Sequence, residues 1–100
     1  MSETPELATK PKNKTEKPKQ WVVVAHNDDF TPIDFVIAVF HKVFKLSLDE
    51  AHAKTLEVHN KGKAIVCTAP FEVAEMKVAI TMGWAKQEEH PFRVEAQPQE

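Results

Sequence analysis

The residues best suited to chemistry lie in one polar run, Asn27-Asp28-Asp29-Phe30-Thr31-Pro32, between an apolar stretch and a helical pattern. The threonine of this run can cap the following helix, and the proline suits its first helical position. Asp34 then complements the positive end of that helix. The first three polar side chains, Asn27, Asp28 and Asp29, exceed what capping requires. We interpret them as a cluster of oxygens that is presented to a ligand.

His59 is the second chemical candidate, at the end of another helical pattern. A neutral imidazole, an amide oxygen and a carboxylate all accept hydrogen bonds, so His59, Asn27 and Asp28 together would suit an ammonium group. The residues expected to line an apolar hollow beside them are Ile33, Thr55 and Val58. This combination predicts a site for a free amino group that is attached to an apolar side chain. The alternative for His59, a hydrogen bond to a carbonyl at its own helix end, stays open.

Five histidines and many carboxylates also raise the alternatives of a metal site and of an enzyme. His52 and His59 lie two turns apart on one helical pattern, but no metal-binding spacing such as HExxH occurs. The only glycines, Gly62 and Gly83, form no phosphate-binding loop. Cys67 lies inside an expected strand, where a cysteine is usually a small core residue. We therefore expect no metal, no cofactor and no catalysis; a hydrolase is the alternative that turnover of a peptide would reveal.

The composition fits one small domain. The chain has 100 residues, of which 42% are hydrophobic, and a formal net charge of -2, which predicts no general affinity for nucleic acid or membranes. No apolar run reaches the roughly 18 residues of a membrane span, and no apolar signal-peptide core is present at the N-terminus. We therefore expect a cytoplasmic protein, and a monomer.

The N-terminal region differs from the rest of the chain. Residues 1–20 are rich in lysine and proline and contain one large apolar residue, Leu7. Such a segment buries too little surface to offset its ordering entropy. We expect a flexible extension over 1–20, acting as a solubilising leader or as a tether, then a core domain over 21–96 and a frayed end over 97–100.

Hydrophobic periodicity predicts six elements in the core domain. The expected strands are 21–25, 63–68 and 92–95, and the expected helices are 33–44, 48–60 and 71–87. Ser47 and Glu50 form a capping box at the start of the second helix, Gly62 ends it, and Pro70 opens the third. The buried stripes are expected at Leu48, Ala51, Thr55 and Val58 on the second helix, and at Val73, Met76, Ile80 and Trp84 on the third.

The order β-α-α-β-α-β predicts an α+β fold. We expect a small three-stranded antiparallel sheet with three helices packed on one face.

Three motifs in the same order match a known family. Residues 27–32 match N-D-D-[YF]-T-P, residues 58–64 match V-H-x-x-G-x-A, and residues 72–77 match E-V-A-E-x-K, with His90-Pro91 following at the family's spacing. On these motifs the chain resembles ClpS, the bacterial N-end rule adaptor that recognises N-terminal degradation signals for the ClpA–ClpP protease.

The resemblance implies a role for each matching residue. The α-amino group of a substrate's first residue would be held by Asn27, Asp28 and His59. The hydrophobic pocket would comprise Asp29, Thr31, Ile33, Thr55, Val58 and Phe92. Glu72 and Lys77 would contact the N-terminal domain of the ClpA unfoldase, and the N-terminal extension would assist delivery. The partners implied are N-degron peptides and proteins and a AAA+ unfoldase.

Four positions depart from the usual family pattern. Many ClpS proteins have methionine at the positions of Ile33 and Thr55, leucine at Phe92 and an aliphatic residue at His26. These changes leave the amine-binding set intact and alter the apolar one, so they imply a divergent or second ClpS with a narrowed or shifted preference. The alternative function is an interaction module that docks a AAA+ partner through the 71–87 helix and binds no N-degron.

Overall fold

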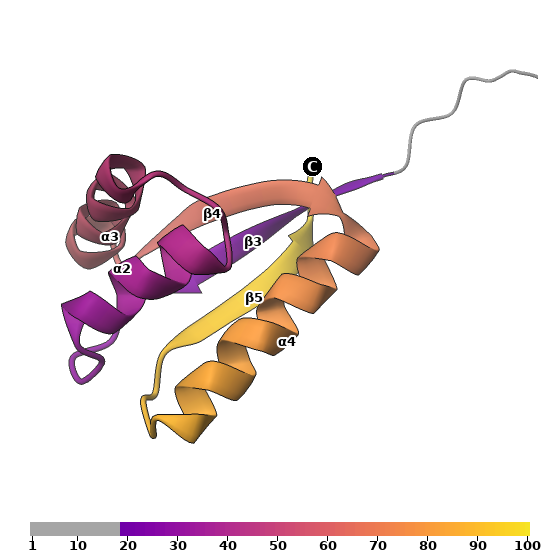
Figure 1. Ribbon diagram of the computed structural model, residues 1–100. Coiled ribbons are helices and arrows are strands. Elements are labelled where there is room, and N and C mark those ends of the chain that lie inside the picture. The colour runs from indigo at the N-terminus through magenta and orange to yellow at the C-terminus, as the bar shows by residue number, and fades with distance from the viewer. Residues whose placement is uncertain (1–18) are drawn as a thin grey trace, which may run out of the picture.

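The computed structural model describes residues 19–100, so the predicted extension over 1–20 lies almost wholly outside the described residues. The elements in chain order are β3 (Gln20–His26), α2 (Ile33–Lys42), α3 (Leu48–Lys61), β4 (Lys63–Pro70), α4 (Phe71–Gln87) and β5 (Arg93–Pro98) (Figure 1). This order confirms the predicted β-α-α-β-α-β arrangement.

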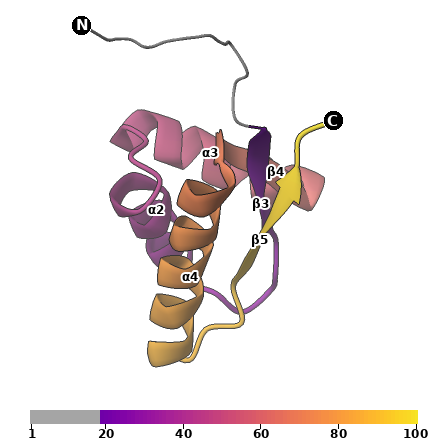
Figure 2. The same cartoon turned by 90° about the vertical axis from the view of Figure 1, so that its right-hand side faces the viewer.

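The sheet has β3 at its centre, with β4 and β5 paired antiparallel on its two sides. Four consecutive residues of β3, from Val22 to Ala25, are buried. β-branched residues are favoured in such a strand because their side chains pack well on a pleated surface. In Figure 2 the sheet is seen nearly edge-on, and α2, α3 and α4 all lie on the same side of it. The predicted fold class is therefore confirmed.

Helix α3 begins and ends at the predicted signals. The hydroxyl of Ser47 accepts a hydrogen bond from Glu50 N at 3.1 Å, and Glu50 Oε1 accepts one from Ser47 N at 2.9 Å. Gly62 ends the helix at a φ of 89°, a left-handed conformation that costs glycine little. Its carbonyl oxygen accepts a hydrogen bond from Asn27 N at 2.9 Å, which ties the end of α3 to the polar run after β3.

The start of α2 differs from the prediction. Pro32 is the N-cap, and no side chain caps the helix. The predicted cap, Thr31, instead donates its hydroxyl to Asp28 Oδ2 at 2.8 Å. This is possible because the polar run folds back on itself as a turn, so the threonine hydroxyl faces the aspartate. Asp34 does lie in the first turn of α2, as expected.

The predicted buried stripe of α4 was wrong. Val73, Met76 and Ile80 are exposed, and Trp84 is half-buried. The residues of α4 that are fully buried are small, namely Ala74, Thr81 and Ala85. Small side chains let the helix approach closely to the strands, and the larger apolar ones are then left on the outer side. Leu48, expected in the core from α3, is likewise exposed.

Strand β5 is longer than the predicted 92–95. It continues to Pro98, and Gln97 is opposite Val22 in the register with β3. Two residues of the end expected to fray, 97–100, therefore belong to the sheet.

Candidate functional site

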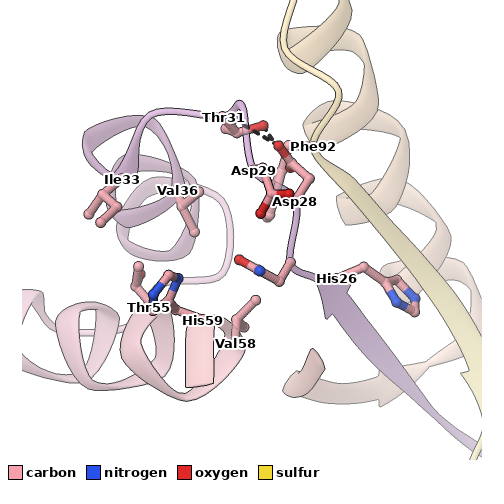
Figure 3. Close-up of a pocket in the computed structure, with 11 residues that line it drawn as sticks. His26, Asp28, Asp29, Thr31, Ile33, Val36, Thr55, Val58, His59 and Phe92 are labelled. Atoms are coloured by element: carbon pink, nitrogen blue, oxygen red, sulfur yellow. Dashed lines mark hydrogen bonds between the residues drawn. The ribbon is translucent and has the colours of Figure 1, made fainter. Parts of the chain in front are cut away.

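A cavity of about 220 Å³ opens where the polar run after β3 meets α2 and α3 (Figure 3). All nine residues predicted for the amine site and the hydrophobic pocket line this one cavity, and the structure adds two more. The lining residues are His26, Asn27, Asp28, Asp29, Thr31, Ile33, Val36, Thr55, Val58, His59 and Phe92. Positions far apart in the sequence are thus brought to a single site.

One wall of the cavity is apolar and is built by two helices. Ile33 and Val36 extend from the start of α2 toward the end of α3 that carries Thr55 and Val58 (Figure 3). Val36 and Val58 are almost fully buried, whereas Ile33 is 55% exposed and stands at the mouth. The buried hydroxyl of Thr55 donates to Ala51 O at 2.7 Å, so its hydrogen is satisfied within the helix.

The opposite wall is the polar run, and Asp28 organises it. Asp28 Oδ1 accepts hydrogen bonds from the backbone N–H groups of Phe30 and Thr31, each at 2.8 Å. The threonine hydroxyl donates to Oδ2. Burial raises the pKa of Asp28, but these three hydrogen bonds outweigh it and bring the pKa below the usual aspartate value. The carboxylate is therefore a fixed negative charge at the cavity, and its geometry is set before any ligand arrives.

His59 and Asn27 come from different segments and are held near one another by the backbone. His59 lies in the last turn of α3, just before Gly62, whose carbonyl oxygen accepts the hydrogen bond from Asn27 N. Within residues 19–100 the imidazole of His59 has no hydrogen-bond partner, so the alternative of a bond to a helix-end carbonyl is not observed. Its ring stands beside Thr55 at the cavity in Figure 3.

His26 and Val36 are the two lining residues that the sequence analysis missed as site residues. The ring of His26 is directed away from the cavity toward β5 (Figure 3), and its Nε2 lies 2.6 Å from Glu95 Oε2. This hydrogen bond is the main reason that the pKa of Glu95 is lowered. Val36 had a usable signal, because it follows Ile33 by three residues and so shares its side of the helix.

The residues assigned to a partner interface lie outside the cavity, on α4. Glu72 is exposed in the first turn of α4. Lys77 is partly buried, donates from Nζ to Val43 O at 2.7 Å, and lies 5.8 Å from the centroid of the Phe44 ring. Lys77 therefore holds α4 against the C-terminal end of α2. The exposed apolar side chains of α4 are Phe71, Val73, Met76 and Ile80.

Neither a metal-ligand cluster nor a membrane-spanning helix occurs in the described part of the chain. Among residues 19–100, no three histidine, cysteine or acidic side chains come together as metal ligands would. Nor is any helix in that range both long enough and apolar enough to cross a membrane.

Comparison with known proteins identifies relatives over most of the sequence. The family model for "ATP-dependent Clp protease adaptor protein ClpS" matches residues 16–95. A ClpS from Vibrio atlanticus is 43% identical over 87 residues, covering 87% of this chain and 82% of that protein. A ClpS from Deinococcus radiodurans is 40% identical over 88 residues, covering 88% of this chain and 78% of that protein.

A solved structure matches the fold as well. Agrobacterium tumefaciens ClpS2, bound to L-phenylalaninamide, superposes with a TM-score of 0.80 at 30% sequence identity, covering 83% of this chain and 100% of that one. The family match extends over most of the sequence, and the curated relatives are covered over most of their length. The chain therefore belongs to the ClpS family of adaptor proteins of the ATP-dependent Clp protease.

Proposed function

We propose that this chain is a non-enzymatic adaptor that binds the first residue of N-degron substrates and delivers them to the ClpA unfoldase of ClpAP. The observation that carries the proposal is the composition of the 220 Å³ cavity, in which hydrogen-bond acceptors and apolar side chains stand on facing walls. A chain terminus with a bulky apolar first residue offers both complements, an ammonium group and a hydrophobic side chain.

The proposed amine site consists of Asn27, Asp28 and His59. An ammonium group has three donors, and these side chains supply an amide oxygen, a carboxylate and a neutral imidazole as acceptors. Charge-assisted hydrogen bonds of this kind contribute about 1.5–3 kcal/mol each. Asp29 lines the same cavity and adds a second carboxylate. An acetylated or internal residue has a single amide N–H and would leave acceptors unpaired.

The proposed side-chain site is the apolar wall. A cavity of roughly 150 Å³ is enough for a benzene ring, so 220 Å³ has room for an aromatic side chain. Burying a phenylalanine side chain contributes about 1.5–3 kcal/mol, well short of the roughly 8 kcal/mol of micromolar affinity. Both halves are therefore needed. The similar ClpS2 structure supports this, because its ligand, L-phenylalaninamide, has a free amino group and a phenyl ring.

The preference of this pocket is proposed to be narrower than usual. Ile33 stands at the mouth, and its β-branched side chain is stiff, so ligands branched at Cβ should be rejected there. Thr55 is shorter than methionine and changes the wall that α3 provides. Phe92 is buried and adds an aromatic face to the cavity.

Delivery is proposed to use α4, none of whose residues lines the cavity. Glu72 is exposed and free to contact the N-terminal domain of ClpA. Lys77 contributes through the position it gives α4, because its ammonium group is already bonded to Val43 O. The exposed apolar residues of α4 favour the alternative as well, a module that docks the unfoldase without binding an N-degron.

Fluorescence anisotropy with labelled peptides tests the proposal. A peptide that begins with phenylalanine should bind, and its N-acetylated twin should not. A panel that varies only residue one should rank bulky unbranched side chains first and isoleucine or valine last. Equal affinities of the free and acetylated peptides would refute the amine site, and turnover of any peptide would favour a hydrolase.

A further inference from the structure

The cavity contains fixed negative charge but no fixed positive charge. Asp28 and Asp29 both line it, and none of its other lining residues within the described chain is a lysine or an arginine. The two basic rings are His26 and His59. His26 is turned toward β5 and bonded to Glu95, and so is engaged outside the cavity. A ligand that carried a carboxylate would find no side-chain partner for it here.

The start of α2 does not supply the missing positive charge. Helix N-termini attract anions through their free N–H groups and the helix dipole, and α2 begins beside the cavity at Ile33. However, Asp34 in the first turn already places a carboxylate at this end, and that carboxylate offsets the helix dipole.

We infer that the cavity accepts a first residue only when its carbonyl is in amide linkage, as in a protein chain, and excludes free amino acids. This rests on the proposed function, because it assumes that the ligand's ammonium group is held by the acceptors on the polar run. In a free amino acid the carboxylate is attached to the same carbon as the ammonium group. Once the ammonium is bound, that carboxylate lies within a few ångströms of Asp28 and Asp29, where repulsion between like charges is poorly screened.

The consequence concerns competition. A free aromatic amino acid presents the same side chain and the same ammonium group as a substrate's first residue, so the apolar wall and the acceptors cannot distinguish the two. Asp28 and Asp29 distinguish the two by repelling the carboxylate of the free amino acid, so the selection comes from weaker binding of the wrong ligand. Protein termini are thereby selected from among chemically similar small molecules.

The experiment compares L-phenylalaninamide with L-phenylalanine as competitors of a labelled peptide that begins with phenylalanine. At neutral pH both keep an ammonium group, and they differ mainly in the charge of the carboxyl end. The amino acid should bind roughly tenfold more weakly or worse, since its carboxylate meets two others. Asp29→Asn should lower the ratio of the two dissociation constants, amino acid over amide, several-fold, and so should added salt. Glu75→Gln, which removes one carboxylate from an exposed position of α4, should leave it unchanged.

Equal displacement by the amide and the amino acid would overturn the inference, and so would a ratio that neither Asp29→Asn nor salt changes. Different results would contradict the proposed function and the selection against free amino acids. If neither the amide nor the labelled peptide binds, the proposed function itself is wrong. If the peptide binds and free phenylalanine competes as well as the amide, only the selection against free amino acids is wrong.

Discussion

At the scale of single residues, Asp28 shows how an anion is prepared for a ligand. Its carboxylate accepts three hydrogen bonds from Phe30 and Thr31, which fix its orientation and keep it ionised. Those bonds form within the run itself, so the charge is in place without any rearrangement on binding. Thr31, which was predicted as a helix cap, supplies two of the three donors, its backbone N–H and its hydroxyl.

Thr31→Val should raise the pKa of Asp28 and weaken peptide binding. The change removes a hydroxyl that stabilises and orients the ionised carboxylate, a hydrogen bond of about 1 kcal/mol. Binding must then restore that orientation, so the dissociation constant should rise by up to about fivefold. In the native chain the lowered pKa means that this stabilisation is complete above the ordinary aspartate value of about 3.9 and is lost as the pH falls through the lower folded value. An NMR titration of the Asp28 carboxyl carbon measures the shift directly.

Thr68→Val is the matched control, because Thr68 is exposed on β4 and far along the sheet from Asp28. It should leave the titration of Asp28 and the peptide affinity unchanged. An Asp28 midpoint that stays where it was in Thr31→Val would mean that the hydroxyl does not stabilise the carboxylate.

Most of the cavity could be predicted at this scale, and the two omissions have physical reasons. The nine predicted residues all line it, but their roles as ligand contacts stay predictions. His26 was missed because its ring is turned away, so it contributes to the wall beside Asn27 rather than a functional group. Val36 was missed because it belongs to the core, although a residue at the edge of the core can also line a cavity that opens from it.

At the scale of elements, the end of α3 joins the two halves of the cavity. Gly62 adopts a φ of 89°, and its carbonyl receives the N–H of Asn27. The helix that carries His59 and the run that carries the aspartates are therefore connected through one backbone hydrogen bond at a glycine. Because Gly62 adopts a left-handed conformation, replacing it should destabilise the protein even though the residue is exposed.

Gly62→Ala should destabilise the protein, and Gly83→Ala should stabilise it. A Cβ at either position would meet no atom within 4 Å, so crowding is the same and only the backbone differs. Alanine at the left-handed position costs about 1–2 kcal/mol. Alanine inside helix α4 gains about 0.5–1 kcal/mol over glycine. Urea unfolding of both variants measures the two changes, and shifts of the same sign would contradict this account.

The elements themselves followed from local signals, whereas the faces of α4 did not. The capping box, the terminal glycine and the β-branched strand are each set by residues adjacent in sequence, and those predictions were confirmed. Which side of α4 is buried depends on how closely the sheet approaches. Ala74 and Ala85 permit that approach, but a pattern of apolar residues gives most weight to Val73, Met76 and Ile80. The order of the strands within the sheet has no local signal at all.

At the scale of the whole molecule, the proposed ligand site and the proposed unfoldase site occupy different elements. The cavity is lined by the run after β3, by α2 and α3 and by Phe92, whereas α4 contributes no lining residue and carries exposed residues of its own. Helices α2 and α4 are in contact at two points, because Lys77 bonds Val43 O at the end of α2 and the ring of Trp84 packs against that of Phe35.

Single substitutions should separate the two functions. His59→Ala should abolish binding of a peptide that begins with phenylalanine and leave binding to the N-terminal domain of ClpA intact. Glu72→Lys should do the opposite, because it reverses an exposed charge on α4 without touching the cavity. Calorimetry with each ligand measures both affinities, and circular dichroism checks that both variants are folded. Loss of both activities in either folded variant would show that the sites are not independent.

Strand β3 also fixes the distance between the start of the domain, at Gln20, and the polar run. It enters the sheet at Gln20, beside Pro70 and the last residues of β5, and reaches the polar run only after His26 (Figure 1). Seven residues of strand span roughly 20 Å, so Gln20 and the polar run lie at opposite ends of β3. A fluorophore attached to the side chain of Gln20 would therefore lie about 20 Å from the polar run and would leave the proposed cavity unobstructed.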